Sequence, residues 1–385
     1  HRIKETITSS GLKIVEHMEK SPSRKKEGLL LVSDYRVEIF DYRTNQRKIM
    51  YSYRNDPHRG RVMTNIHLFA FKGKHRFFRN EVLLQRFFFK QLMEEFPETK
   101  TIIIDRGEES EAALYDHCPP EIKLIEIVHA DHLSDRDVPR APLWNNYYEY
   151  ALTHLEQVTH IVVATELQRQ DLLIDFPNES EKIVTIPVGG IRDMTEESFE
   201  KGKQQAEKFV TVSRLASEKH IDLVIRAIAA AKKEHPTLSL DIYGQGGEES
   251  KLNAIIKELN AEEYIQLKGH SHAINEVYPN YDAFISGSFS EGFGLTYIEA
   301  LNAGLPIVTY KARFGAMELI KEGVNGYLKD FSRNDDTYNV QQLTEGIRQL
   351  VATDLNQLKA NTRKSVRMFQ DSIIAEKWSE LIDAL

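Results

Sequence analysis

Short apolar runs and amphipathic segments alternate regularly from residue 208 onward, and this alternation constrains the fold more than any other feature of the chain. One amphipathic segment, His220 to Pro236, places Ile221, Val224 and Ile228 on a single helical face. The predicted strands are 209–212, 238–243, 264–267, 282–286 and 306–310, and the predicted helices are 220–236, 250–259 and 294–303. Strands that alternate with helices form a parallel sheet covered on both faces, which binds ligands at the carboxyl ends of its strands.

Residues 100–190 repeat this pattern less completely. Their predicted strands are 101–105, 124–129, 160–164 and 183–188, fewer than a complete domain of this class needs. Residues 28–78 instead alternate apolar and polar side chains and turn at 43–46, which predicts an antiparallel β-meander. A helix is predicted over 80–95, and after residue 339 we expect helices to the end, the last centred on Trp378.

The composition is typical of a soluble globular protein of two domains, with 385 residues, 41% hydrophobic and 28% charged. No segment reaches the roughly 20 apolar residues of a membrane helix, and the polar N-terminal residues predict no secretory signal. The single cysteine, Cys118, excludes an intrachain disulfide and favours a reducing compartment. We therefore expect a cytoplasmic protein with at most peripheral membrane contact. Because His1 is not an initiator residue, we also expect that an N-terminal piece is missing or removed.

Charge is spread unevenly along the chain, whose formal net charge is -8. The first 100 residues hold 21 Lys and Arg against 12 Asp and Glu, a balance of +9, and the remainder holds 29 against 46, a balance of -17. A basic module on an acidic chain favours an acidic partner, although chance asymmetry of a solvated surface explains the same numbers. We expect no nucleic-acid partner.

Two glutamates, Glu291 and Glu299, flank a glycine-rich junction of strand and helix in the stretch SEGFGLTYIEALNAGLPIV. Glycines let the backbone approach a ligand closely, and a helix N-terminus presents unpaired N–H groups with a partial positive charge. This combination predicts a phosphate site. Arg214 and Lys219, at another strand end of the same sheet, would supply the cations for a diphosphate.

Carboxylates beside a phosphate repel it, so the two glutamates need another task. Accepting hydrogen bonds from the vicinal hydroxyls of a ribose or a sugar is the task that fits this position. The alternative is a surface helix with two solvated glutamates.

The Glu-x7-Glu pair is preceded by Ser-Arg-Leu-x3-Lys at 213–219 and followed by Gly-x-Pro-Ile-Val at 304–308. This combination resembles the retaining glycosyltransferases of the GT-B type, family 4, over residues 100–385. The resemblance implies an α/β fold with two Rossmann-like domains facing a cleft, and transfer of a hexose from a nucleotide-sugar donor. It implies neither a metal nor a further cofactor, so Asp135-Arg136-Asp137 is interpreted as a chance match to a metal-binding Asp-x-Asp.

The resemblance assigns roles to individual residues. Arg214 and Lys219 would bind the diphosphate, Glu291 would hold hydroxyls of the donor sugar, and Glu299 would bind the ribose. The amides that face the donor would be those of Gly292, Phe293, Gly294 and Leu295, and the nucleoside pocket would be lined by Gly244, Lys268, Gly269 and His270.

His129 ends the predicted strand 124–129 and so points at the cleft. In similar enzymes a histidine here lies near the donor sugar and supports the transition state, so Glu291 and His129 are the predicted catalytic residues. A core histidine with satisfied hydrogen bonds is the alternative. The resemblance implies no covalent nucleophile: the leaving phosphate helps to deprotonate the acceptor on one sugar face. The protein would then contribute positioning and charge stabilisation.

A narrower resemblance between 128 and 190 is to bacterial enzymes that place N-acetylglucosamine on serine-rich surface adhesins. It rests on His129-Ala130-Asp131-His132, on residues 143–150 and 183–189, and on the stretches 241–244 and 264–270. These enzymes, their relatives acting on serine–aspartate repeats, and teichoic-acid glycosyltransferases carry a β-rich insertion that residues 28–78 fit. In these relatives the insertion helps bind the acceptor, a partner subunit or another copy of the enzyme. Serine–aspartate repeats and polyol phosphates are both acidic, so a basic insertion suits either.

The predicted domains follow from these patterns: an N-terminal remnant (1–27), the β-meander insertion with its helix (28–98), an N-terminal Rossmann-like acceptor domain (99–205), a C-terminal nucleotide-sugar domain (206–365) and a helix packing back on the N-terminal domain (366–385). Two features depart from the family. No opening strand with a glycine loop precedes residue 28, and Phe314-Gly315-Ala316 replaces the usual Tyr-Gly-Pro. Because the glycine is kept, we expect the second departure to matter little.

Three functions remain. The first is transfer from UDP-N-acetylglucosamine to Ser or Thr hydroxyls of a serine-rich or serine–aspartate-repeat protein. The second is glycosylation of a teichoic acid, and the third is a non-catalytic partner subunit. The presence of the four donor-binding side chains argues against the third. Residues 144–148, Trp-Asn-Asn-Tyr-Tyr, favour the first, although they also fit a helix that packs aromatic side chains into the domain.

Overall fold

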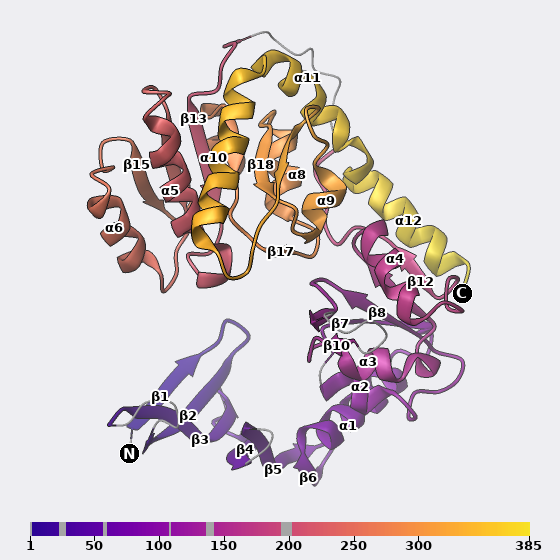
Figure 1. Cartoon of the computed structure of the whole chain (residues 1–385). Helices are drawn as coiled ribbons and strands as arrows, with labels where there is room; N and C mark the ends of the chain where they lie inside the picture. The colour runs from indigo at the N-terminus through magenta and orange to yellow at the C-terminus, as the bar shows by residue number, and fades with distance from the viewer. Residues whose placement is uncertain (1, 23–27, 57–59, 108, 136–141, 194–201) are drawn as a thin grey trace. The chain divides into compact units, whose positions relative to one another are not determined.

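The computed structural model describes the chain except residues 1, 23–27, 57–59, 108, 136–141 and 194–201. The chain divides into two compact units. Unit 1 contains residues 1–124 and 150–158, and unit 2 contains residues 125–149 and 159–385. The long strands of unit 1 and the strands and helices of unit 2 are visible in Figure 1.

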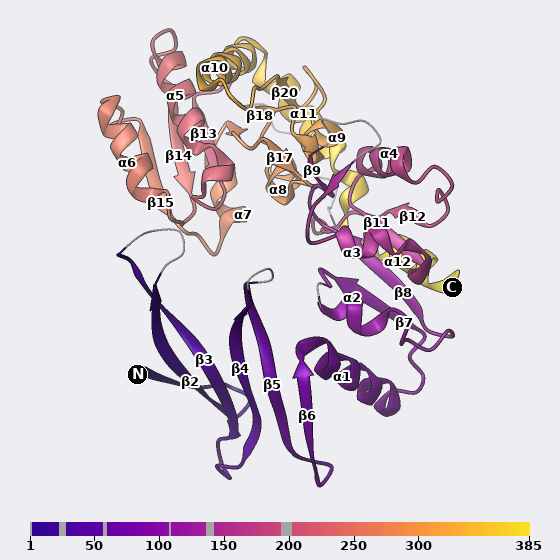
Figure 2. The same ribbon diagram turned by 60° about the horizontal axis from the view of Figure 1, so that its bottom comes forward.

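Unit 1 contains a six-stranded antiparallel sheet in which each strand pairs with the next along the chain (Figure 2). Its strands are β1 (Arg2–Ile7), β2 (Leu12–Pro22), β3 (Leu30–Asp41), β4 (Arg47–Asp56), β5 (Gly60–Phe71) and β6 (Lys74–Asn80). The predicted meander is confirmed, but it starts well before residue 28, because β1 and β2 belong to the same sheet. Every residue of β1 is exposed, so no alternation of apolar side chains marks it in the sequence.

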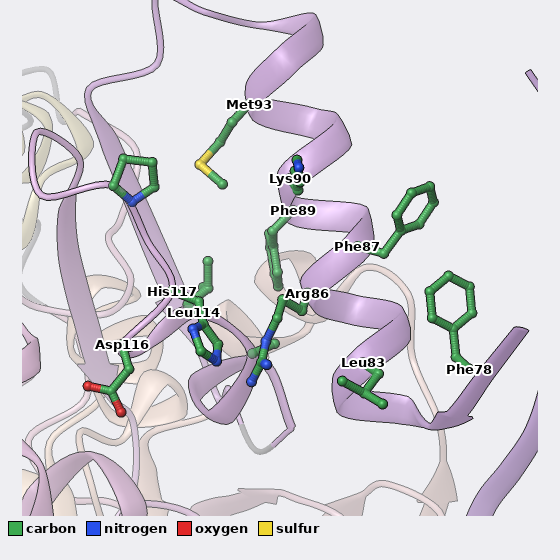
Figure 3. A pocket seen from close by; sticks show the side chains of 12 residues that line it. Phe78, Leu83, Arg86, Phe87, Phe89, Lys90, Met93, Leu114, Asp116 and His117 are labelled. Carbon is green, nitrogen blue, oxygen red and sulfur yellow. The ribbon is translucent and has the colours of Figure 1, made fainter. Parts of the chain in front are cut away.

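Helix α1 (Glu81–Glu95) follows β6 and begins after Asn80, whose side chain accepts a hydrogen bond from the N–H of Leu83. The helix is rich in apolar residues, yet none of its residues is buried. A groove of about 720 Å³ separates it from the segment 113–119. In Figure 3, Phe89 and Met93 project from α1 toward this segment. Unit 1 therefore exposes an apolar groove along α1.

The chain passes from unit 1 to unit 2 within β8 (Lys123–Val128). This strand belongs to a four-stranded sheet with the order β12-β11-β8-β7. The other strands are β7 (Thr101–Asp105), β11 (His160–Val163) and β12 (Ile183–Thr185), and the helices near them are α2 (Glu109–Leu114), α3 (Glu149–Thr153), η1 (Leu155–Gln157) and α4 (Glu166–Asp175). Strands β8, β11 and β12 pair in parallel, as their apolar sequences predict.

The last helix, α12 (Asp371–Asp383), packs against strands β8, β11 and β12. Ile374 and Trp378 of this helix lie against a small core formed by Ile125, Val162 and Ile186. The C-terminal helix therefore covers the smaller sheet of unit 2.

Six parallel strands form the larger sheet of unit 2, in the order β15-β14-β13-β16-β18-β20. They are β13 (Lys208–Val212), β14 (Ser239–Tyr243), β15 (Ile265–Gly269), β16 (Ala283–Ile285), β18 (Ile307–Tyr310) and β20 (Gly326–Lys329). One buried cluster contains side chains of α5 (Ile221–Lys232), α6 (Glu249–Glu258), α10 (Asp336–Ala352) and α11 (Leu355–Ser365), and a second contains those of α8 (Leu295–Asn302) and α9 (Gly315–Leu319). The predicted doubly covered parallel sheet is confirmed.

The direction in which successive strands are added reverses between β13 and β16. At such a point the loops after the strands diverge to opposite faces of the sheet and leave a crevice at its carboxyl edge. The elements around this crevice are short: η2 (Ser217–Lys219), α7 (Ile274–Val277), η3 (Tyr278–Asn280), and the two-residue strands β17 (Ser290–Glu291) and β19 (Arg313–Phe314).

Candidate functional site

Lys219 and Glu291 meet at the carboxyl edge of the larger sheet. Lys219 ends η2, which follows β13, and Glu291 ends β17, which follows the neighbouring strand β16. The Nζ atom of Lys219 lies 2.5 Å from Oε1 of Glu291, and the two side chains are 19% and 17% exposed. An ion pair this shielded is less screened by water and salt than a surface pair. It fixes one cation and one carboxylate in the crevice.

The strand that carries Glu291 is held by β19. Ser290 pairs with Arg313 and Glu291 with Phe314, in parallel. Because side chains alternate along a strand, Glu291 and Ser290 project from opposite faces of this two-stranded ribbon.

Gly315, next to β19, lets the backbone of the Glu291 loop lie directly on it. A Cβ atom at Gly315 would lie 1.7 Å from the carbonyl oxygen of Phe293. No side chain fits in that space, so the glycine kept in Phe314-Gly315-Ala316 is a steric requirement of the site.

His129 lies beside the same loop. A Cβ atom at Gly292 would lie 2.1 Å from the carbonyl oxygen of His129, so the two backbones are in contact. The N–H groups of His129 and Ala130 both donate hydrogen bonds to the hydroxyl of Tyr148, at 3.1 and 3.0 Å. Tyr148 thereby fixes the path of the chain after β8. The two residues predicted as catalytic, His129 and Glu291, thus lie on adjoining segments.

Helix α8 begins beside this contact. Gly294 has a φ of 89° and precedes Leu295, the first helical residue. The first N–H groups of a helix have no acceptor within it and carry a partial positive charge. Tyr297, in the first turn, bonds through its hydroxyl to Ser286 and Thr309, which anchors the start of α8 on the sheet. The structure places the Gly292 to Leu295 segment at a helix N-terminus, next to Glu291.

Glu299 lies in the second turn of α8 and is half-buried. Burial raises the pKa of its carboxyl, and a hydrogen bond from Tyr278 partly opposes this effect. The hydroxyl of Tyr278 donates to Oε2 of Glu299 over 3.3 Å. Tyr278, which is fully buried, therefore orients the carboxylate and favours its charged form. No pattern in the sequence indicates this contact.

The remaining residues predicted to bind the donor lie at the ends of β13, β14 and β15. The side chain of Arg214 is 73% exposed and pairs with Glu218 rather than with Glu291. The N–H of Gly244 donates to the carbonyl of Gly269, which joins the ends of β14 and β15. Nζ of Lys268 lies 3.9 Å from Asp241, and His270 packs edge-on against His272. These residues line one edge, and among the described residues Lys219 and Glu291 form the ion pair between predicted site residues that lies nearest the start of α8.

The aromatic stretch 144–148 packs into unit 2, but it is not helical. Trp144 belongs to β10 (Leu143–Trp144), which pairs with β9 (Leu133–Asp135), and α3 begins only at Glu149. Trp144 stacks on Phe176 with ring centroids 5.6 Å apart. The turn between β10 and α3 is what brings the hydroxyl of Tyr148 to the backbone of His129.

No cluster of side chains that could hold a metal ion occurs among the described residues. Of the Asp-x-Asp match, Arg136 and Asp137 lie outside the described part of the chain. Within that part, no helix is long and apolar enough to cross a membrane.

Comparison with protein families matches residues 193–366 to "Glycosyl transferases group 1". The chain is 38% identical over 273 residues to the UDP-N-acetylglucosamine--peptide N-acetylglucosaminyltransferase GtfA subunit of Streptococcus pneumoniae, covering 68% of this chain and 52% of the relative. It is 25% identical over 311 residues to a poly(ribitol-phosphate) alpha-N-acetylglucosaminyltransferase of Staphylococcus aureus, covering 80% of this chain and 60% of that protein. The chain thus spans about half the length of the relatives it matches.

Solved structures show the same likeness. The pneumococcal O-GlcNAc transferase GtfA in complex with UDP and GlcNAc superimposes with a TM-score of 0.71 at 28% identity, covering 99% of this chain and 79% of that one. A GtfA/B complex gives a TM-score of 0.70 at 26% identity, covering 100% and 81%. These likenesses show the predicted GT-B fold with its antiparallel insertion.

Proposed function

The chain belongs to the glycosyl transferases group 1, and we propose that it is a retaining, metal-independent glycosyltransferase that moves N-acetylglucosamine from UDP-N-acetylglucosamine to Ser or Thr hydroxyls of a serine-rich or serine–aspartate-repeat bacterial surface protein. The contact between Lys219 and Glu291, at the start of α8 and beside His129, is the observation that carries this proposal. It joins a cation, a carboxylate and a helix N-terminus, the three groups needed by a sugar diphosphate.

The donor would lie along the carboxyl edge of the larger sheet. The diphosphate would be bound by Lys219, Arg214 and the amides that precede α8. Together these groups form a fixed anion site of the kind found at helix N-termini. Glu299 would accept hydrogen bonds from the ribose, and the ends of β14 and β15 would hold the base. Arg214 would have to leave Glu218 to reach a phosphate, which costs little because surface ion pairs contribute about 0–1 kcal/mol.

The reaction would use positioning and charge rather than a covalent intermediate. Lys219 would stabilise the negative charge that develops on the leaving UDP, and Glu291 would hold the donor sugar through its hydroxyls. The incoming hydroxyl would attack from the face that the phosphate leaves, so that a phosphate oxygen takes its proton. Fixed charges of this kind contribute most where water is largely excluded.

The first experiment offers UDP-N-acetylglucosamine to the full-length protein with a serine–aspartate-repeat peptide and, separately, with a polyol-phosphate oligomer. Mass added to the peptide, with equivalent release of UDP, is the expected result. Transfer to the polymer alone would replace the proposal by teichoic-acid glycosylation, which the similarity to the staphylococcal relative favours. No release of UDP with either acceptor would favour the third function, a non-catalytic partner subunit.

UDP binding is expected to weaken in acid through the protonation of Glu299. Its pKa is raised by burial, so the charged form that accepts from a ribose is lost at a higher pH than for an exposed glutamate. Tyr278→Phe removes the bond that opposes this effect, and we expect the midpoint of the acid limb of UDP affinity to move to higher pH. Titration calorimetry between pH 4 and 8 measures the midpoint. An unchanged midpoint in the variant would contradict this role of Tyr278.

The insertion would supply the acceptor dock. Several of its cations lie over aromatic rings, among them Arg47 over Phe69 at 4.4 Å and Arg61 over Tyr53 at 3.5 Å. Rings of this kind hold the long basic side chains in place at the sheet surface. A basic surface attracts an acidic chain in a salt-dependent way.

Reversing exposed charges of the insertion tests this dock. The triple change Arg43→Glu, Lys74→Glu and Arg79→Glu is expected to raise the acceptor KM about tenfold at low salt and to leave UDP affinity unchanged. A matched triple change in unit 2, Lys233→Glu, Lys257→Glu and Lys364→Glu, should leave both constants within about twofold. Equal effects of the two triple variants would contradict a specific electrostatic dock on the insertion.

The groove along α1 would serve a partner subunit or a second copy of the chain. One of the similar solved structures is a GtfA/B complex. Apolar side chains of α1 line this groove, including Leu83, Phe89 and Met93. Contiguous patches of this kind mark interaction surfaces more often than chance. Light scattering of the protein alone and with a candidate partner tests the assignment, with Phe89→Ser, a change within the groove lining, expected to reduce association.

A further inference from the structure

A second, smaller pocket lies on unit 2, with a volume of about 280 Å³. Ser290 of β17 and Arg313 of β19 both line it. These residues are opposite each other in the ribbon, whereas Glu291 projects from its other face. The pocket therefore occupies the face of the ribbon that the Lys219–Glu291 pair does not use. Only one peptide unit, about 3.8 Å between Cα atoms, separates its wall from Glu291.

The pocket is electropositive. Three cationic side chains line it, from Lys311, Arg313 and Arg333, against the one carboxylate of Asp131. Arg313 lies 3.6 Å from Asp131, which neutralises part of its charge. Lys311 pairs at 2.8 Å with Asp330, an exposed residue outside the pocket lining. For Arg333, no ion pair within 4 Å occurs in the described part of the chain, so the pocket keeps a surplus of positive charge.

Aromatic rings form the apolar part of the lining. Phe289 and Phe331 both line the pocket and stack with their ring centroids 4.6 Å apart and their planes at 19°. Rings bind the methylene groups of a polar ligand while the charged groups above them bind its head. The volume of about 280 Å³ lies just below the usual range of ligand sites, which suits one side chain better than a nucleotide.

We propose that this pocket is an acceptor subsite that binds the carboxylate of an acidic residue close to the serine or threonine that receives the sugar. The proposal rests on the proposed function. Lys311 and Arg333 would bind the carboxylate, and the side-chain methylenes would lie on Phe289 and Phe331. An extended peptide advances about 3.3 Å per residue, so we place the acidic residue within about three positions of the acceptor hydroxyl. The pocket would thus read the sequence of the acceptor next to its hydroxyl.

A peptide carboxylate fits these observations better than the phosphate of a polyol chain. The pocket is compact, whereas a polymer with a charge at each repeat needs a continuous basic groove. The similarity to peptide-modifying relatives, at 38% identity, also exceeds the similarity to the polymer-modifying one, at 25%.

The test compares two acceptor peptides that contain one serine and differ at a single neighbouring position, Asp or Asn. For the full-length wild-type protein we expect kcat/KM about tenfold higher with Asp, the size of one charge-assisted interaction. The double variant Lys311→Gln and Arg333→Gln should reduce this preference to about twofold or less, with the UDP dissociation constant unchanged. Lys364→Gln, an exposed lysine of α11 remote in sequence from the pocket, serves as the matched control and should keep the preference.

Binding of the same fluorescent peptides, followed by anisotropy, separates the two proposals. If the wild type modifies neither peptide, the proposed function fails; tighter binding of the Asp peptide by the wild type, lost in the double variant, would still support the subsite. If the wild type and the double variant prefer the Asp peptide over the Asn peptide to the same degree, in turnover or in binding, the subsite proposal is overturned. The proposed transfer to peptides would still stand. A double variant that loses transfer to the polyol phosphate but keeps its discrimination between peptides would overturn it in favour of a phosphate site.

Discussion

Glu291→Gln is expected to lower the rate of sugar transfer by about 10²- to 10³-fold, the cost of removing one preorganised charged group from an active site. The amide keeps the size of the side chain and a hydrogen-bond acceptor for Lys219, which lies 2.5 Å from the carboxylate. It removes the negative charge that would hold the donor hydroxyls. UDP lacks the sugar, so UDP affinity should change much less than kcat. The measurements are kcat with UDP-N-acetylglucosamine and the UDP dissociation constant by calorimetry.

The matched control is Glu263→Gln, which removes the same charge from an exposed position of unit 2. Its kcat should stay within about twofold of the wild type, since single exposed charges contribute little. A melting temperature of the Glu291 variant above the assay temperature would show that the loss is not unfolding. Transfer within threefold of the wild-type rate would refute the role given to Glu291, whatever the acceptor.

The larger sheet of unit 2 was predictable because its central strands, β13, β16 and β18, are largely buried on both faces. A strand such as β13 then appears in the sequence as a continuous apolar run between turn signals, and the helices between strands carry a clear apolar face. The opposite case is β1, which is exposed along its whole length and shows no pattern. Sequence patterns record burial, so an exposed edge strand such as β1, which is held by backbone hydrogen bonds and a surface ion pair between Lys4 and Glu16, escapes them.

The candidate site was predictable in its position but not in its contacts. Loops after parallel strands gather at one edge of the sheet, which is enough to bring Lys219 and Glu291 into one crevice. The two-residue strands β17 and β19 are too short to leave a periodic signal, and the bonds from Tyr148 and Tyr278 join segments through the fold. For the contacts of β17 and β19, the one sequence feature that pointed to them was the glycine of Phe314-Gly315-Ala316. Its steric role becomes clear only from the position of the Phe293 carbonyl.

Gly315→Ala is expected to lower the free energy of unfolding of unit 2 by about 2–4 kcal/mol, in the range of severe overpacking. The new methyl group would lie 1.7 Å from the carbonyl oxygen of Phe293, and backbone atoms cannot rotate away as a flexible side chain could. This clash can be removed only if the loop that carries Gly292 to Gly294 moves. UDP affinity should therefore fall with stability, because that loop supplies the amides at the start of α8.

Gly247→Ala is the matched control, since a methyl group there meets no atom within 4 Å. Because alanine restricts the unfolded chain, Gly247→Ala should leave the free energy of unfolding unchanged or raise it by up to about 1 kcal/mol. Both tryptophans, Trp144 and Trp378, belong to unit 2, so unfolding in urea followed by tryptophan fluorescence reports on the unit that holds both glycines. A free energy of unfolding of the Gly315 variant within about 0.5 kcal/mol of that of the control, with normal UDP affinity, would mean that the loop moves aside without loss of stability. In that case the Phe293–Gly315 contact does not fix the position of Glu291. A large loss of stability and UDP affinity in the Gly315 variant alone would mean that the ribbon of β17 and β19 sets the geometry of the site. That ribbon could then form only with a glycine at position 315.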